Sequence, residues 1–324
     1  MYVGLADWLA VIEREYLRDF IPQGGSAVKF AVVSPSLEAD EVGGGLARLA
    51  RENGCLYAAV DATTTKLHMI DQFFFAVARQ IDWDDLARRF LRRLLAEGGF
   101  TLPTGSMALD YSSIADANDY SEAELRRDVR LLLTSRVFRD FAMAQEFRIA
   151  MVRLCQAQLE IDASAGPETE AVKEWLRGEL RSIVLLRAAL IFQRIARHNG
   201  RDMFLSLAHW ARLAGYQGLI LSLDVERYFV DRIPVERDGS LFHTTTAVLD
   251  AYEVFRQLID ATDEFEGCLL VVTAPPSFLE DPKRGLERYD PLKLRIWDEV
   301  RDRRIANPLA SLVRLRADAA RAVA

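Results

Sequence analysis

The sequence predicts an α/β protein with an open, doubly wound parallel sheet and a large helical insertion. Three observations lead to this fold: five short apolar runs, helical patterns between them, and a helix-rich interval of about 150 residues after the second run. Because none of the runs alternates strictly between apolar and polar residues, they are typical of parallel strands covered by helices on both faces. The runs are VKFAVVS (28–34), CLYAAVD (55–61), LILSLD (219–224), CLLVVTA (268–274) and ASLVRL (310–315).

Helical patterns lie next to these runs. GGGLARLARENG (43–54) follows the first run, and AVLDAYEVFRQLIDATDEFEG (247–267) precedes the fourth. The second pattern carries mixed charges on its outer face and ends at a glycine, which is a common helix stop. The alternation of strand and helix is what predicts the open sheet.

The long interval between the second and third runs is predicted to be helical almost throughout, in two stretches, 121–161 and 169–200. Ser121 and Glu124 form a capping box at the start of the first stretch, and Pro167 marks the break between the two. We therefore expect three parts: a first part of the sheet domain (1–104), a helical insertion or lid (105–200), and the remainder of the sheet domain (201–324).

The composition is that of a globular protein without a strong positive field. Half of the 324 residues are hydrophobic, the net charge is −7 and the isoelectric point is about 5.3. The chain as a whole is therefore not attracted to nucleic acid or anionic membrane, and any contact with DNA must be local or made through a partner. No apolar run approaches the roughly 20 residues that a membrane span needs, so we expect a cytoplasmic protein.

The cysteines and histidines do not form a recognisable metal site. The three cysteines are scattered, and two lie in predicted strands, which indicates buried free thiols. The four histidines are equally dispersed and lack the spacing of metal ligands, so we expect no metal centre. These residues are Cys55, Cys155, Cys268, His68, His198, His209 and His243.

The loop after the first run, SPSLEADE (34–41), has the length of a Walker A loop, G-x-x-x-x-G-K-[ST], but not its chemistry. A working loop needs glycines so that N–H groups can wrap the phosphates, a lysine for the β- and γ-phosphates, and a hydroxyl for Mg²⁺. Here Ser34 and Ala39 replace the glycines, Asp40 replaces the lysine, and Glu41 replaces the hydroxyl residue.

Acids in this loop oppose nucleotide binding. With Glu38, three acids crowd the position that a triphosphate would occupy, so we expect ATP binding to be weak or absent and Mg²⁺ binding not to occur. The alternative is an ordinary loop before an acid-rich helix N-terminus, which the helix dipole favours. The glycines at 43–45 indicate close packing or a late helix start rather than a phosphate site.

Two later strands end at residues that a nucleotide site would use. GLILSLDVERY (218–228) has the form of a Walker B strand, with Asp224 as the Mg²⁺-binding acid, Val225 after it, and Glu226 in a position to polarise water. An apolar strand that ends at a capping acid would look the same. The fourth run places Thr273 at a strand tip, where a sensor of the γ-phosphate would lie.

An arginine-rich segment, FLEDPKRGLERYDPLKLRIWDEVRDRR (278–304), follows the fourth run. Most of its arginines are expected to form i,i+4 ion pairs on a solvated helix. Arg284 lies in a Pro/Gly-bounded turn and is our first candidate for an arginine that reaches a neighbouring subunit; Arg288 is the second.

Taken together, YLRDFIPQGGSAVKFAVV, LARLARENGCLYAAVDA, SLAHWARLAGYQGLILSLDVERY and FLEDPKRGLERYDPLKLRIWDEVRDR resemble the ATP-binding P-loop proteins of BREX and BREX-like antiphage systems. The resemblance extends from about residue 15 to 315 and implies an AAA+/STAND-like P-loop NTPase sheet with the five runs in the order 5-1-4-3-2. It implies that Asp224 is the Walker B acid, Thr273 the sensor-like residue and Arg284 an inter-subunit arginine. In that family the loop after the first strand carries glycines and Gly-Lys-Ser/Thr, so the present loop is a degenerate P-loop.

Three functions are open: a regulatory or DNA-contacting protein unrelated to nucleotides, and two that follow from the resemblance. The first of these two is a pseudo-ATPase subunit of a defence complex, a scaffold or regulatory partner of an active ATPase. The second is an ATP-hydrolysing protein whose site is rearranged or completed by another chain. The expected partners are other subunits of the system, in particular an ATP-competent paralogue. Assembly into a homo-oligomer is an alternative. Nucleic acid would be contacted only indirectly.

Overall fold

The computed structural model describes residues 2–102, 109–160, 166–230, 239–297 and 306–318. The chain divides into two compact units. The sheet unit comprises residues 1–73 and 216–324, and the helical unit comprises residues 74–215. Among the described residues, no helix combines the length and the apolar character needed to cross a bilayer.

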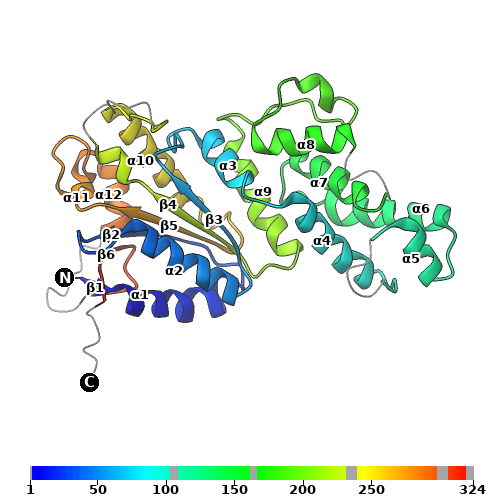
Figure 1. Cartoon of the computed structure of the whole chain (residues 1–324), viewed down its shortest axis with the longest axis horizontal. Coiled ribbons are helices and arrows are strands. Elements are labelled where there is room, and N and C mark those ends of the chain that lie inside the picture. Colours follow the sequence, from blue (N-terminus) through cyan, green and yellow to red (C-terminus); the bar gives the residue numbers. More distant parts are fainter. Residues whose placement is uncertain (1, 103–108, 161–165, 231–238, 298–305, 319–324) are drawn as a thin grey trace. The chain divides into compact units, whose positions relative to one another are not determined.

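The sheet unit is built on six parallel strands in the order β1-β6-β2-β5-β4-β3 (Figure 1). The five predicted runs become β2 to β6, and their order agrees with the order that the resemblance implies. The sequence did not predict the edge strand β1, because two residues are too short to show a pattern. The strands are β1 (Val3–Gly4), β2 (Ala27–Val33), β3 (Leu56–Asp61), β4 (Leu219–Asp224), β5 (Cys268–Ala274) and β6 (Leu312–Arg316).

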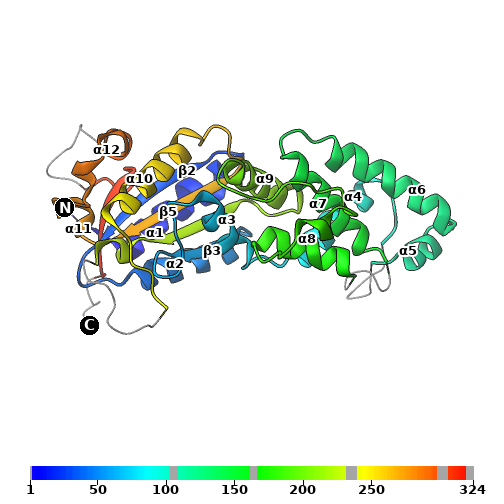
Figure 2. The same ribbon diagram turned by 90° about the horizontal axis from the view of Figure 1, so that it is seen from above.

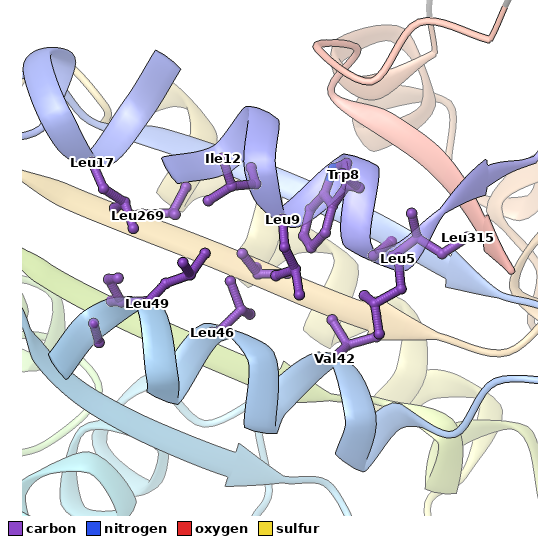
Figure 3. Close-up of a cluster of buried hydrophobic side chains, with 14 of the residues drawn as sticks. Leu5, Trp8, Leu9, Ile12, Leu17, Val42, Leu46, Leu49, Leu269 and Leu315 are labelled. Carbon is purple, nitrogen blue, oxygen red and sulfur yellow. The ribbon is translucent and has the colours of Figure 1, made fainter. Parts of the chain in front are cut away.

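One face of the sheet is covered by α1 (Leu5–Val11), which continues as a π-helix (Ile12–Phe20), and by α2 (Ala39–Glu52). Leu9 of α1 and Leu46 of α2 belong to the same buried cluster as side chains of β5 and β6 (Figure 3). Burying one such side chain stabilises the fold by about 1.5–3 kcal/mol. This packing fixes the position of α2, and therefore of the loop before it, relative to the strand ends.

The opposite face is covered by α10 (Thr245–Asp260) and, further along the chain, by α11 (Ser277–Glu280) and α12 (Asp290–Ile296), as Figures 1 and 2 show. Phe30 of β2 stacks on Phe278, with ring centroids 5.8 Å apart. Phe30 also meets an aromatic ring of α10 edge to face. Two covered faces explain why the predicted strands show no strict alternation.

Glycines in α2 allow α1 to approach closely. A Cβ atom at Gly45 would lie 2.5 Å from Cδ1 of Leu9, whereas a Cβ atom at Gly44 would meet nothing within 4 Å. Gly43 accepts a hydrogen bond at its carbonyl oxygen from the Tyr57 hydroxyl, at 3.0 Å. The helix already begins at Ala39. The glycine triplet therefore serves packing, one of the two roles expected from the sequence, and does not delay the helix.

The helical unit contains the end of α3 and the helices from α4 to α9. Ser121 and Glu124 form the predicted capping box of α6. The described elements are α3 (Ile70–Ala78), α4 (Trp83–Glu97), α5 (Tyr111–Ala117), α6 (Glu122–Leu133), a π-helix (Thr134–Phe138), α7 (Gln145–Ala157), α8 (Pro167–Arg177), a 3-10 helix (Ile183–Leu186) and α9 (Gly200–Leu213).

The second predicted helical stretch, 169–200, is wrong beyond Arg177. Gly178 adopts a left-handed conformation with φ of 73° and ends α8, and a Cβ atom there would lie 2.5 Å from the Phe75 ring. After the 3-10 helix, residues 191–196 have no regular structure. Apolar periodicity suggested a helix, but a glycine in a position that excludes side chains stops it.

The three cysteines are buried and free, as predicted. Burial raises the pKa of the Cys55 thiol to about 11 and that of Cys268 to about 12. The pKa of Cys155 is raised further for the same reason. These thiols stay protonated near neutral pH, and a protonated thiol is a poor nucleophile and metal ligand.

Lys29 lies in the interior of β2. Its ammonium group donates to the carbonyl oxygens of Leu309 at 2.6 Å and Ala310 at 3.4 Å, and it lies 4.6 Å from the centroid of the Tyr16 ring. Burial lowers the pKa of Lys29 to about 8. The lysine thus ties β2 to the segment that enters β6 through these hydrogen bonds. Its burial disfavours the charged form of the side chain.

We expect Gly45→Leu to destabilise the sheet unit by about 1–3 kcal/mol, because the new side chain overlaps Leu9 in a packed interface. Gly44→Leu is the matched control: it lies one position earlier in the same helix, meets open space, and should be neutral or slightly stabilising. Chemical denaturation measures both. Equal effects of the two variants would contradict the packing role of Gly45.

We expect the stability contributed at Lys29 to rise with pH. Between about pH 8 and the ordinary lysine pKa of 10.5, the unfolded chain holds a proton that the folded chain has lost, so the free energy of unfolding increases over this window. Relative to Lys29→Met, the wild type should gain about 1–3 kcal/mol between pH 7.5 and 10. If the difference in free energy of unfolding between the two proteins is the same at pH 7.5 and at pH 10, Lys29 does not titrate in this range.

Candidate functional site

The carboxyl ends of three neighbouring strands place Asp61, Asp224 and Thr273 in one row. In the sheet register, Asp61 pairs with Asp224 and Asp224 pairs with Thr273. Ile220 and Val271 of the same strands belong to the cluster under α2, and side chains two residues apart share a face. The row therefore lies on the face that α2 covers, at the edge of the sheet where α2 begins.

Asp224, the predicted Walker B acid, lies in a strongly acidic surrounding. Burial raises the pKa of Asp224 to about 6, and the N–H of Glu226, which donates to Oδ1 at 2.8 Å, acts in the opposite direction. The carboxylates of Asp61, Glu226 and Asp40 raise the pKa further. The fold thus brings Asp40, from the predicted Walker A position, close enough to Asp224 for the two charges to repel.

The loop between β2 and α2 does not have the geometry of a phosphate cradle. Such a cradle uses successive N–H groups that point to one spot, which requires residues in the left-handed region. No residue from Ser34 to Glu41 has a positive φ. The amide of Ser34 donates to Leu315, that of Leu37 donates back to the Ser34 carbonyl, and the Ser34 hydroxyl bonds the Ser36 hydroxyl at 2.9 Å.

The first turn of α2 contains the other predicted Walker A positions. Ala39 and Asp40 open the helix, and the Glu41 carboxylate accepts a hydrogen bond from the Glu38 amide at 3.2 Å. The Glu38 N–H group, which a bound phosphate would need as a donor, is therefore already hydrogen-bonded to the Glu41 side chain. Glu41, at the position that the sequence alignment with a Walker A pattern assigns to the hydroxyl residue, thus stabilises the helix start.

No basic group neutralises these acids in the described part of the chain. None of the ion pairs found there includes Asp40, Asp61, Asp224 or Glu226. Over the same residues, no three His, Cys, Asp or Glu side chains are arranged to hold a metal ion. The arrangement therefore repels anions without forming a metal cage.

Thr273, the predicted sensor-like residue, has a buried hydroxyl. The residue is 2 % exposed, and within the described part of the chain Oγ1 has no hydrogen-bond partner. Its carbonyl oxygen accepts from the amide of Val225, which continues the pairing beyond Asp224. An unpaired buried hydroxyl costs about 1–3 kcal/mol, so a polar ligand in the row would gain this donor.

The structure does not support Arg284 as an arginine offered to another subunit. The residue is 5 % exposed, and its guanidinium donates to the carbonyl oxygens of Tyr228 at 2.8 Å and Val230 at 3.1 Å. Its own carbonyl oxygen accepts from the Tyr252 hydroxyl at 2.6 Å. Arg284 therefore joins the segment after β4 to the turn before α12. Arg288, our second candidate, is exposed.

Sequence reasoning missed residues that shape the rim of the site. His243 bonds the carbonyl oxygen of Ala62 at 2.7 Å and packs edge to face on Tyr228, with ring centroids 4.5 Å apart. This joins the segments that follow β3 and β4. Asp61 could have been predicted from the sequence, because it ends an apolar strand just as Asp224 does. His243 could not, because its partners are distant in sequence.

A family profile described as the BREX system ATP-binding protein BrxC/D matches residues 107–322, about two thirds of the chain. The chain belongs to this BREX family. Comparison with curated proteins and with solved structures gave no match. Membership in the BREX family confirms the resemblance inferred from the sequence. The matched stretch includes Asp224 and Thr273 and begins after the loop at 34–41.

We expect Arg284→Met to destabilise this BREX protein by about 2–4 kcal/mol, because two carbonyl oxygens lose a charged donor in a buried place. Arg288→Met, on the exposed side of the same segment, should change stability by less than about 0.5 kcal/mol. Thermal and chemical denaturation of the two variants make the comparison. Equal stability of Arg284→Met and wild type would mean that the guanidinium is not a structural tie.

Proposed function

We propose that this BREX-family chain keeps the P-loop NTPase fold but does not hydrolyse ATP by itself, and acts as a scaffold or regulatory partner of an active ATPase. The observation that carries the proposal is the loop before α2. The Asp40 carboxylate raises the pKa of Asp224 by repulsion, and the Glu41 carboxylate accepts a hydrogen bond from the Glu38 amide. The position that should attract a phosphate is thus negatively charged and partly closed by the protein itself.

Electrostatics and backbone geometry act in the same direction. A triphosphate brings about four negative charges, and each contact with a carboxylate in a partly buried place costs on the order of a few kcal/mol. Without a left-handed residue between Ser34 and Glu41, the backbone gives no compensating set of N–H donors. Both barriers would have to be removed before the loop could bind nucleotide.

One observation favours the second candidate, an ATPase whose site is completed by another chain. Asp224 and Thr273 lie side by side at the strand ends, and the Thr273 hydroxyl has no hydrogen-bond partner among the residues that the structure describes. A second chain that supplied a lysine and Mg²⁺ could use both residues. The family description names ATP binding, which is compatible with this arrangement.

For partners, we propose an ATP-competent paralogue in the same defence complex, in the cytoplasm, with nucleic acid contacted only through other subunits. A chain that cannot hydrolyse ATP can still present an arginine to the nucleotide of its neighbour, where a guanidinium stabilises charge on the transferred phosphoryl group. With Arg284 buried, Arg288 is the candidate in this segment.

We expect no affinity for Mg·ATP tighter than about millimolar in calorimetry. Asp40→Lys with Glu41→Thr should give only a modest gain, because the backbone barrier stays. Adding Ser34→Gly and Ala39→Gly restores the full G-x-x-x-x-G-K-T pattern and should give the largest gain. Micromolar binding by the wild type would overturn the proposed function.

For the partner, we expect the protein to raise the ATP turnover of an ATP-competent paralogue by at least about tenfold, since such arginines contribute about three to five orders of magnitude where they act. Arg288→Ala should remove the gain while the complex persists on gel filtration. If the variant stimulates as well as wild type, Arg288 is not the residue concerned. If the two proteins do not associate, the shared-site arrangement fails.

A further inference from the structure

The chain between α8 and α9 exposes large apolar side chains. This part of the helical unit contains the 3-10 helix (Ile183–Leu186) and the irregular residues 191–196. Single exposed apolar residues are ordinary, but several so close together in one stretch indicate a binding surface. Four are each more than half exposed: Val184 (55 %), Leu185 (56 %), Leu190 (55 %) and Phe192 (66 %).

Hydrogen bonds hold this stretch in a compact turn. The Ile191 amide donates to the Leu186 carbonyl at 3.1 Å, and the side chains of both residues are fully buried. The Arg194 guanidinium donates to the Arg181 carbonyl at 3.3 Å and so joins the two ends of the stretch. The turn is therefore anchored on the helical unit, and its exposed apolar side chains lie on one short excursion of the chain.

Leu190 has a backbone conformation that its contacts within the chain do not explain. Its φ is 64°, in the left-handed region, which costs a leucine about 1–2 kcal/mol. Its side chain is more than half exposed, so burial offsets little of this cost. Backbone strain of this kind is concentrated at sites that bind or act on other molecules.

Every charged side chain of this stretch is basic, and we call residues 181–197 the arginine surface. No aspartate or glutamate occurs between Leu180 and Arg201. The nearest acid before the stretch, Glu179, is paired with Arg79 at 3.4 Å. The arginines of the surface are all exposed: Arg181, Arg187, Arg194 and Arg197.

These four arginines are not neutralised by acids of the chain. None of the ion pairs found in the described ranges includes any of them. A further guanidinium approaches from α7, because Arg153 donates to the Ala188 carbonyl at 3.3 Å. In a chain of net charge −7, the arginine surface is a local positive region around exposed apolar side chains.

We propose that the arginine surface docks an acidic amphipathic segment of a partner protein. The apolar side chains of that segment would cover the exposed leucines and Phe192, and its carboxylates would pair with the arginines. Centres of protein interfaces are rich in arginine and aromatic residues and poor in lysine and acids, which is the composition of this stretch. Arginine also binds a carboxylate through two parallel hydrogen bonds, which fixes the orientation of the partner.

Lipid and nucleic acid fit the arginine surface less well. The amides of Phe192 and Arg194 have no hydrogen-bond partner among the residues that the structure describes. In hydrocarbon such amides would stay unsatisfied, whereas a protein partner can accept hydrogen bonds from them. Nucleic acid bases would stack on Phe192 alone, and the three exposed aliphatic side chains would remain in water.

The test uses the full chain and three synthetic amphipathic peptides of about 16 residues, long enough for about four helical turns. All three carry the same leucine and phenylalanine stripe at helical spacing, and their remaining positions are glutamate, glutamine or lysine. Fluorescence anisotropy should show the glutamate peptide binding at least about tenfold more tightly than the glutamine peptide, and the lysine peptide binding most weakly.

Two double variants locate the binding on the arginine surface. Leu185→Ser with Phe192→Ser removes apolar contact, and Arg187→Gln with Arg197→Gln removes charge. Each should weaken binding of the glutamate peptide by about tenfold. The arginine variant should also lower the preference for the glutamate over the glutamine peptide, which a merely structural effect would leave unchanged.

The matched controls are Leu131→Ser and Arg136→Gln, at an exposed leucine and an exposed arginine elsewhere in the helical unit, and both should bind as wild type. Equal binding of the glutamate and glutamine peptides, or no binding of either, would contradict an acidic partner. Loss of binding in the controls as well would place the peptide elsewhere.

Competition experiments decide between a protein partner and the other anions. Displacement of the peptide by vesicles with about 30 % phosphatidylserine would assign the surface to lipid, provided that it requires Arg187 and Arg197. Displacement by a single strand of about 20 nucleotides, with the same requirement, would assign it to nucleic acid. None of these measurements involves ATP, so failure here leaves the proposed function standing, and failure of the ATP prediction leaves this site standing.

Discussion

The unshifted parallel pairing of β3, β4 and β5 determines what this protein can do at its strand ends. Asp61, Asp224 and Thr273 lie in one row because their strands pair residue for residue and stop at the same edge. Packing of α2 on the same face then brings Asp40 to this row. The residues can change, but the place where they meet is fixed by the core.

The acids at this edge are compatible with the fold because three of them have a local role. The Asp61 carboxylate accepts from the Thr63 amide, that of Asp224 accepts from the Glu226 amide, and that of Glu41 accepts from the Glu38 amide. Each acid thus caps the turn or helix that follows a strand. Repulsion among them is tolerated since these N–H groups supply partial compensation. Carboxylates can therefore occupy this edge while the sheet stays intact.

The sequence predicted the sheet well. Apolar runs bounded by turns predicted five strands and placed Asp224 and Thr273 at strand ends, because period and polarity are local signals. Arg284 was misjudged since its partners, Tyr228 and Val230, lie more than 50 residues away. The helix expected after Arg177 fails for a similar reason: only the packed structure shows Phe75 against Gly178.

Family membership and the loop give separate information about this chain. The matched stretch, 107–322, contains most of the helical unit and the strands β4, β5 and β6, whose residues are held by burial on both faces. The loop at 34–38 is short, and Pro35, Ser36 and Glu38 in it are exposed, so substitutions there disturb little packing. Hydrolysis needs a lysine and free N–H groups in that loop, whereas docking needs only the surfaces of the two units. A chain under selection for docking alone can therefore keep its core and its strand ends while the loop takes on residues that stabilise α2.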